Sequence, residues 1–417
     1  MTLADEENED SSAPDTASIE SLFVLLMSWL YRQRNFTPEM LTAEEVQRFI
    51  NAHTDYLNKA VETVLAEVPM DDISVRRLKE SNYVFSGIKT FHELNEAFPS
   101  LLDLNGVLKP FNQFLNDVQT INKSYNGQYL KVEYEFAKSS AYMAARWKEF
   151  EKDGEDYYLQ YRTAGDARVR KTHQRLHGIT LPITSKFWDK YFPPNGWNCR
   201  CTVVQVRKDK YPLSDETQAM NLGSQATAGK HQEMFMYNPG KKMTTFPAYN
   251  AYTRKACINC KNGGNNELCQ ACKVVRKMKK TEIIRDRKTA VKKARKELEK
   301  WYKENLPTVK VGKMEMNRFE VATPEEQVRT VINRNFYEET ASKRKDSPDY
   351  AQRLELARQA HQIFPKAKYV RDEKPRDHLD AITFKVYEYE TEYGIVEFKC
   401  KVNKDGYFLH YMRLLKE

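Results

Sequence analysis

Apolar residues recur every three or four positions along much of the first 153 residues. The pattern is clearest in LTAEEVQRFI (41–50), LNKAVETVLAEV (57–68) and FNQFLNDVQTI (111–121). Such spacing puts apolar side chains on one face of a helix, while prolines and the Asn105-Gly106 pair supply breaks between helices. The sequence therefore predicts a mainly helical region over residues 21–153.

Toward the other end of the chain, the pattern changes from helical spacing to alternation. YAQRLELARQAHQIF (350–364) is amphipathic at helical spacing, and it precedes AITFKVYEY (381–389), IVEFKCKV (395–402) and YFLHYMRLL (407–415). Alternation is typical of strands, and the residues between these strands favour tight turns. We expect an α+β protein with a predominantly helical N-terminal half and a small C-terminal domain, a helix plus an antiparallel meander, over residues 313–417.

Further regions lie between these two. Residues 154–252 mix a charged helix with short extended pieces rich in turn residues, which indicates a separate compact core. A cysteine-rich segment follows at 253–275. Residues 273–305 contain neither Gly nor Pro, so we expect one long exposed helix, of which 276–305 is a basic linker.

Charge is distributed unevenly along the chain. Residues 1–20 hold seven acidic residues and no basic one, which predicts a disordered acidic tail. The segment Lys273–Lys300 holds thirteen lysines or arginines against four acidic residues, and its charge of +9 equals the net charge of the whole chain. Outside this segment the protein is neutral.

The length and composition suit two or more domains with polar surfaces, since the chain has 417 residues, of which 30% are charged. The apolar run Leu22–Leu30 is far shorter than the roughly 20 residues of a membrane-spanning helix, and an acidic segment precedes it. We therefore expect no membrane association and a cytoplasmic location. There the seven cysteines would stay reduced, as ligands or core residues.

A charged helix is expected between Asp166 and Gly178, which can cap its two ends. His173 and His177 are four residues apart and would point the same way. Cys199 and Cys201 would alternate onto one face of a strand, and with the histidines they form a set that zinc accepts.

The same residues are also compatible with plain burial. Two cysteines two positions apart in a strand commonly pack in a core. We favour this second interpretation, in which the helix is locked against the strand, over a metal or catalytic role.

Three arginines in the same stretch allow two interpretations. Arg168, Arg170 and Arg200 could contact DNA phosphates or acidic groups of a partner, because guanidinium groups suit both. Pairing inside the chain with Asp166 or Asp189 is at least as consistent with the sequence.

The clearest metal-binding pattern is a pair of CxxC motifs around the loop KNGGNNEL. Cys257, Cys260, Cys269 and Cys272 could present four thiolates to one ion, the usual structural zinc cage. A filled cage would leave no open position for a substrate. Reduced thiol pairs and disulfides formed in an assembled particle remain alternatives.

The basic helix follows this cysteine pattern directly. The residues alone leave two interpretations open: a solvated connecting helix, and non-specific contact with DNA, because dense lysine and arginine neutralise phosphates without reading sequence. The residues expected at the DNA are Arg276, Lys277, Lys279, Lys280, Lys292, Lys293 and Arg295.

The last three strands carry a candidate catalytic face. Glu397 and Lys399 share a face of the second strand, and the third strand adds either Arg413 or His410, depending on register. Such a set could cleave RNA without metal, with a carboxylate or imidazole moving the 2′-hydroxyl proton and cations stabilising the charged intermediate. An ordinary solvent-facing sheet also contains such residues, so we favour an interaction module over a nuclease or another enzyme.

The stretch 161–206 resembles the diagnostic segment of the phage Mu F-like minor head proteins, the phage head morphogenesis family. The matching residues are Tyr161, Thr163, Asp166, Arg168, Val169, Arg170, His173, Leu176, Gly178, Trp188, Pro193, Pro194, Gly196, Cys199, Arg200 and Cys201. Looser similarity runs from about Val84 to about Tyr252. His177 departs from the pattern, since relatives usually carry a small polar or acidic residue there.

The resemblance implies that residues 154–252 form a Mu F-like head morphogenesis core. The chain would then be a minor head protein that acts near the portal in head assembly and in DNA packaging or delivery. Portal and capsid proteins and non-specific DNA would be its partners. It would be found in the virion, and in the host bacterial cytoplasm during assembly.

Residues 313–417 resemble, in architecture only, the barnase/EndoU/RelE-like nuclease domains of phages. This resemblance implies an alternative function, a head-protein-delivered effector whose C-terminal domain is a ribonuclease or toxin. The sequence leaves open whether the chain is an enzyme, and a structural protein is the interpretation we favour. A packaging motor or a protease is unsupported, because the sequence has no Walker loop, nucleophile elbow or HExxH motif.

Overall fold

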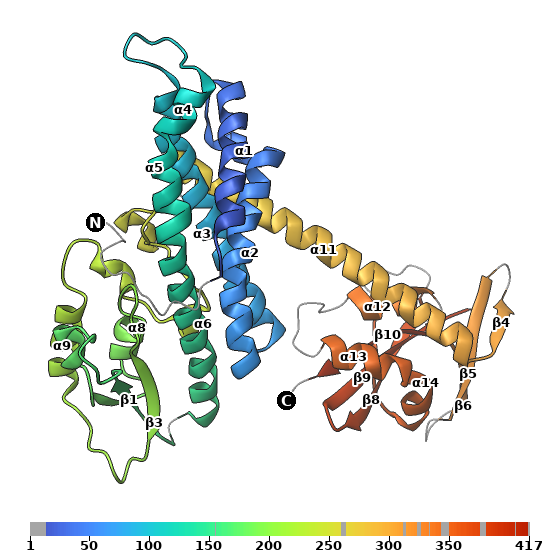
Figure 1. Cartoon of the computed structure of the whole chain (residues 1–417). Helices are drawn as coiled ribbons and strands as arrows, with labels where there is room; N and C mark the ends of the chain where they lie inside the picture. Colours follow the sequence, from blue (N-terminus) through green and yellow to red (C-terminus); the bar gives the residue numbers. More distant parts are fainter. Residues whose placement is uncertain are drawn as a thin grey trace. The chain divides into compact units, whose positions relative to one another are not determined.

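The computed structural model in Figure 1 describes residues 14–154, 156–259, 264–311, 314–322, 327–332, 334–342, 350–375, 381–404 and 406–415. The chain divides into two compact units, Met1–Lys280 and Thr281–Glu417. The boundary between them falls inside the segment that the sequence predicts as a basic linker. In the described part of the chain, no helix combines the length and the apolar character that a membrane span requires.

The first unit begins with a bundle of helices, as the apolar spacing predicts. In Figure 1 the long helices run side by side, and their apolar faces form a shared core. The α5, π-helical η3 and α6 segments follow one another without a break. The elements are α1 (Ala17–Gln33), η1 (Pro38–Thr42), α2 (Glu44–Glu67), α3 (Asp72–Ala97), η2 (Phe98–Leu101), α4 (Phe111–Asp117), α5 (Gln119–Asn122), η3 (Lys123–Tyr129) and α6 (Leu130–Asp153).

The start of α1 corrects the extent of the predicted acidic tail. Residues 1–13 lie outside the described residues, but α1 already begins at Ala17. Ile19 and Phe23 are buried in the bundle core, which orders the end of the segment despite its acidic start. The apolar run Leu22–Leu30 is thus part of a core helix.

The second half of the first unit is a small mixed α+β region. Strand β1 lies in the middle of a three-stranded sheet of order β2-β1-β3, with antiparallel pairing on both sides. The elements are β1 (Tyr158–Arg162), α7 (Lys171–Gln174), β2 (Thr180–Pro182), α8 (Phe187–Tyr191), β3 (Thr202–Val206), α9 (Glu216–Ala226), η4 (Gln232–Phe235), α10 (Pro239–Lys242) and η5 (Lys255–Asn259). Trp188 of α8 is completely buried, and its indole N–H donates to the Pro182 carbonyl at 3.0 Å.

The basic segment lies within one helix, α11 (Glu267–Asn305). Its ends are not exposed as the sequence predicts. Ala271 and Val275 are buried in the core of the first unit, and Leu298 and Tyr302 are buried in the core of the second. The sequence pattern did not reveal these buried residues, because charged residues occupy most of the positions between them.

The second unit is a seven-stranded sheet with helices that pack against it. The three predicted strands correspond to β8, β9 and β10, so the expected α+β fold class is confirmed. The elements are β4 (Thr308–Val311), β5 (Met314–Ala322), β6 (Gln327–Ile332), α12 (Arg334–Ser342), α13 (Tyr350–Arg358), α14 (Ala360–Ile363), η6 (Phe364–Lys366), β7 (Lys368–Glu373), β8 (Thr383–Thr391), β9 (Gly394–Asn403) and β10 (Gly406–Leu415).

The sheet is larger than the meander that the sequence predicts. Its order is β4-β5-β6-β10-β9-β8-β7, and β6 pairs with β10 in parallel. The helices between β6 and β7 lead to the far edge of the sheet, and β7, β8 and β9 then return the chain so that β10 can pair with β6. The predicted single helix over 350–364 is also divided, into α13, α14 and the start of η6.

Candidate metal centre

The charged segment between Asp166 and Gly178 folds mostly as turns, and α7 within it has only four residues. Asp166 does not cap a helix, because α7 begins only at Lys171. Its carboxylate accepts two hydrogen bonds from the Arg200 guanidinium, at 2.6 and 2.7 Å. This interaction lowers the pKa of Asp166 to about 2. Arg170 donates to the Trp197 carbonyl at 2.8 Å. The predicted helix is therefore wrong, and two of the three arginines have partners within the chain.

The two histidines of this segment diverge. His173 lies in α7 and is only 2% exposed. His177 lies beyond the end of α7 and is exposed, with its Nδ1 3.2 Å from the backbone nitrogen of Thr163. The predicted shared face of His173 and His177 is wrong, because the helix ends between them.

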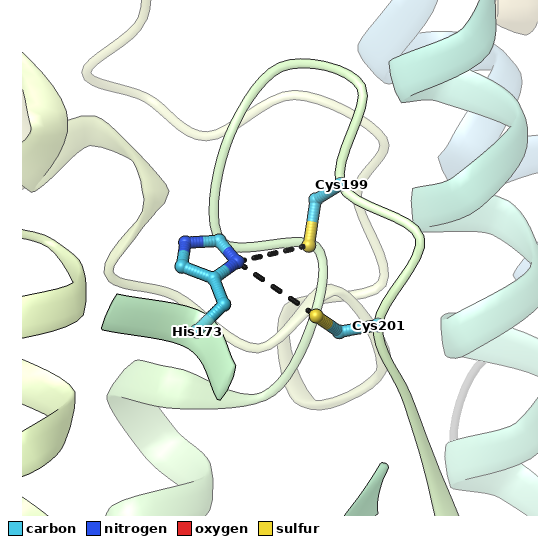
Figure 2. A group of neighbouring side chains, drawn as sticks. All are labelled: His173, Cys199 and Cys201. Carbon is cyan, nitrogen blue, oxygen red and sulfur yellow. Dashed lines mark hydrogen bonds between the residues drawn. The ribbon is translucent and has the colours of Figure 1, made fainter. Parts of the chain in front are cut away.

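Cys199 and Cys201 approach His173 from the segment that leads into β3. Both are buried, and both precede the strand rather than forming part of it. Figure 2 shows the two sulfur atoms facing one edge of the imidazole ring, each 3.7 Å from Nδ1. The three possible ligand atoms all lie within 4.8 Å of one another.

The two thiols of this cluster differ in acidity. The pKa of Cys199 lies well below its usual value, because the Cys201 thiol donates a hydrogen bond to the thiolate and His173 adds a second interaction. The pKa of Cys201 is raised, since its own ionisation would lose that hydrogen bond and place a second charge beside the first. Without a cation, the buried pair therefore carries at most one negative charge.

Several buried groups hold the cluster in place. The Tyr161 hydroxyl of β1 donates to Asn195 Oδ1 at 2.9 Å and also interacts with Cys201. A side chain at Gly196 would approach the Arg170 guanidinium at 3.3 Å and the His173 ring at 3.9 Å. These contacts join β1, α7 and the loop before β3 around one point.

The cluster fits the chemistry of a soft divalent cation, because imidazole and thiolate are the ligands that zinc prefers. Across the described residues, it is the one group of three His, Cys, Asp or Glu side chains that meets this distance criterion. The sequence placed His173, Cys199 and Cys201 together and wrongly added His177.

The paired CxxC motifs are only partly described. Cys260 lies outside the described residues. Cys257 lies in η5, and Cys269 and Cys272 lie in the first turns of α11. The Cys272 sulfur accepts a hydrogen bond from Arg276 Nε at 3.3 Å. The four-thiolate site stays a prediction.

The predicted DNA-binding residues lie on α11, and most are exposed. Lys279 is half-buried and lies over the Tyr83 ring at 4.8 Å. Arg295 is also half-buried and pairs with Glu338 at 3.6 Å. The exposed ones are Arg276, Lys277, Lys280, Lys292 and Lys293.

The candidate catalytic residues of the second unit come together on one face of its sheet. Strand pairing places Glu397 of β9 opposite Arg413 of β10, and Arg413 donates to both carboxylate oxygens at 2.7 and 2.9 Å. The ammonium of Lys399 and the ring of His410, which lies in a bulge of β10, both contact the Phe384 ring.

Two residues that the sequence analysis missed complete this face. Arg371 of β7 donates to Glu397 at 3.1 Å, and Glu373 accepts from Lys399 at 2.6 Å. The alternation of KYVRDE (368–373) was the available signal, but the segment is short and charged. Glu397 is 2% exposed and both its oxygens are occupied, so in this arrangement it holds the two arginines in position.

The region around this His–Cys–Cys cluster matches a known family. Residues 109–204 match the family described as "Phage Mu protein F like protein". The match spans α4 to β3 and includes His173, Cys199 and Cys201.

Three curated proteins are similar to parts of the chain. The "Putative capsid assembly protein F" of Escherichia phage Mu is 39% identical over 71 residues, which are 17% of this chain and 16% of that protein. The Mu-like prophage FluMu F protein of Haemophilus influenzae is 39% identical over 86 residues, or 19% and 21% of the two chains. An uncharacterized protein of Methanocaldococcus jannaschii is 24% identical over 185 residues, or 44% and 27%.

These similarities cover only part of each protein. The aligned segments span about a fifth, or less, of the two F proteins. No solved structure matches the chain.

Proposed function

We propose, from the match of residues 109–204 to the phage Mu protein F-like family, that the chain is a minor head protein that takes part in assembling a phage head. The observation that carries the proposal is the 39% identity to a protein named for capsid assembly. A site near the portal, and a part in DNA packaging or delivery, belong to the same proposal. Portal and capsid proteins would be its partners, and the virion its final location.

The structure of the matched region supports a binding role. Its helices contribute to a large apolar core, and its loops are fixed by buried contacts such as those of Trp188 and Tyr161. A rigid scaffold of this kind can present loops to other proteins without a large loss of entropy on binding.

The proposal is tested in a phage or prophage that encodes the chain. Deleting the gene should reduce the yield of DNA-filled heads seen by electron microscopy, and the protein should be detected by mass spectrometry in purified wild-type heads. Supplying the gene in trans should restore the yield. Heads that assemble, fill and infect normally after the deletion would contradict the proposal.

We propose further that the exposed part of α11 contacts DNA without sequence preference. The replacements Lys292→Glu and Lys293→Glu together should weaken binding to a random-sequence duplex about tenfold and make it less dependent on salt. Fluorescence anisotropy at several salt concentrations measures both effects. The matched control is Lys208→Glu with Lys210→Glu, two exposed lysines outside the helix. An equal loss of DNA affinity in both double variants would contradict a contact at α11, because net charge alone would then explain the loss.

We also propose that the four cysteines of the CxxC motifs bind a structural zinc ion. The proposal rests on their spacing, which is typical of a four-thiolate cage. Zinc content of the purified chain should fall when Cys257 and Cys272 are both replaced by serine. Unchanged zinc content in that variant would contradict it.

A second candidate function is supported by the charged face of the second unit. Arg371 and Arg413 contact Glu397 on that face, and Lys399 and His410 contact the Phe384 ring, so such a face could bind the phosphates of RNA. Under this alternative the second unit is a ribonuclease or toxin delivered with the head. Because Glu397 is held by two arginines, His410 is the better candidate for moving a proton.

Expression of residues 281–417 in bacteria tests this alternative. A nuclease should arrest growth and cleave RNA in vitro, and His410→Ala should abolish both effects. His361→Ala, a replacement of another histidine of the same unit, serves as the control. If expression of the folded fragment is harmless, the nuclease alternative is contradicted and only the structural function remains.

A further inference from the structure

We propose that His173, Cys199 and Cys201 bind a zinc ion, which joins α7 to the loop before β3. The ligand atoms would be the imidazole Nδ1 and the two thiolate sulfurs. This proposal goes beyond a role in head assembly and does not depend on it. The site is also separate from the CxxC motifs, because it shares no cysteine with them.

The distances within the cluster match those of a metal site. Zinc bonds of about 2.3 Å to sulfur and about 2.05 Å to nitrogen, arranged as a tetrahedron, separate the nitrogen and sulfur ligands by about 3.6 Å. The observed distance from His173 Nδ1 to each sulfur is 3.7 Å. Both nitrogen-to-sulfur distances therefore match a tetrahedral site, and the two sulfurs lie within 4.8 Å of each other.

Hydrogen bonding alone explains this arrangement less well. An imidazole Nδ1 carries at most one proton and directs it in the plane of the ring, so it makes one good hydrogen bond. Two sulfurs at equal distance from the same nitrogen cannot both accept it well. A central cation explains the two equal nitrogen-to-sulfur distances, because each ligand atom then points at the ion rather than at another ligand.

Charge and burial also favour zinc. The net charge of two thiolates, a neutral imidazole and one divalent cation is zero. A neutral group has the lowest desolvation cost in a site that is almost closed to solvent. The side chains are only 2%, 5% and 8% exposed for His173, Cys199 and Cys201. Contacts from Tyr161 to Cys201 and from the Arg170 guanidinium to the neighbouring loop fix the ligands from outside, as in many metal sites.

The ion would replace secondary structure that this region lacks. His173 is 26 residues from Cys199, and only β2 and α8, with three and five residues, lie between them. Because these elements are short, a metal that crosslinks the two ends of the segment would stabilise it. Three protein ligands leave a fourth position for water or another small donor.

Cobalt binding by the full chain tests the proposal. The four CxxC cysteines, Cys257, Cys260, Cys269 and Cys272, are first replaced by serine so that only the proposed site can bind metal. This chain should bind about one Co²⁺ and show thiolate-to-cobalt charge-transfer absorption typical of two thiolates. Adding Cys199→Ser and Cys201→Ser should abolish the absorption, whereas Cys400→Ser, which replaces a buried cysteine of the second unit, should not.

A ligand exchange separates metal binding from packing. His173→Cys should keep the ion and increase the charge-transfer absorption by about half, since three thiolates would then bind it, while His173→Phe should lose it. If the folded four-serine chain binds no cobalt, or if the signal survives loss of both Cys199 and Cys201, the proposal is wrong.

The wild-type chain supplies a test that needs no variant. A chelator should make Cys199 and Cys201 reactive to a maleimide, as measured by mass spectrometry of peptides, and excess zinc should restore their protection. Equal reactivity with and without the chelator would overturn the proposal.

Discussion

At the scale of single residues, a group of charged side chains is buried inside the helical bundle, where each charge has a high desolvation cost. Lys89 and Glu133 are completely buried and form an ion pair at 2.6 Å, and Tyr252 also donates to Glu133. Nearby, Glu93 is buried against Asn126 of the π-helix η3 at 3.0 Å. Such a network costs desolvation energy, but it fixes how α3, η3 and α6 pack against each other.

Breaking the buried ion pair should be costly. Lys89→Met leaves the Glu133 carboxylate without its cation and should lower the free energy of unfolding by about 3–5 kcal/mol. Adding Glu133→Gln in the same chain should recover part of this loss. Urea denaturation of the single and double variants measures both changes, and a loss below about 1 kcal/mol would contradict the burial of the pair.

Glu93 should make the stability of the first unit depend on pH. Burial raises the pKa of Glu93 to about 8, so the folded chain keeps a proton that the unfolded chain releases near pH 4.5. The stabilising contribution of protonated Glu93 is therefore complete below about pH 4.5. It is lost as the pH rises toward 8, which lowers the free energy of unfolding by on the order of 4 kcal/mol. Glu93→Gln should remove this decline, whereas Glu67→Gln, an exposed control on α2, should not. Denaturation at pH 5 and pH 8 gives the comparison.

At the scale of elements, close packing depends on small residues that the pattern of apolar positions does not show. Asn238 caps the N-terminus of the short helix α10, because its side chain accepts hydrogen bonds from the backbone N–H groups of Gly240 and Lys241. Gly240 then lies directly against Trp147 of α6, and the Lys241 ammonium lies 4.9 Å from the center of the Trp147 ring.

A side chain at Gly240 should disturb this contact. An added Cβ would lie 2.2 Å from Trp147 Cβ, so Gly240→Ala should destabilise the chain by about 1–3 kcal/mol. Gly127→Ala is the matched control, because an added Cβ there approaches only a Glu20 oxygen, at 3.7 Å. Thermal unfolding followed by circular dichroism distinguishes them, and equal melting temperatures would contradict the close approach.

At the scale of the whole molecule, the chain consists of two units that share the helix α11. The second unit includes Leu298 and Tyr302 of that helix in its core. It also includes β4, which lies before the predicted domain start at residue 313 and pairs with β5. The folding unit is therefore longer than the sequence predicts.

A fragment comparison tests this boundary. Residues 281–417 should unfold cooperatively on heating, because the fragment keeps the buried part of α11. Residues 314–417 lack Leu298, Tyr302 and β4, and they should show a broad transition or none. Calorimetry of the two fragments decides, and equally cooperative unfolding would mean that α11 adds nothing to this core.

The sequence by itself determined the fold class, the helical first half, the three final strands and the residues that resemble the Mu F-like family, because these depend on local periodicity and residue type. It could not place the ends of α11 in two cores, pair β6 with β10, or end α7 before His177. Those outcomes depend on contacts between residues far apart in the chain. The cluster of His173, Cys199 and Cys201 shows the division: the sequence supplied the three side chains, and only the tertiary structure brought their atoms within 4.8 Å of one another.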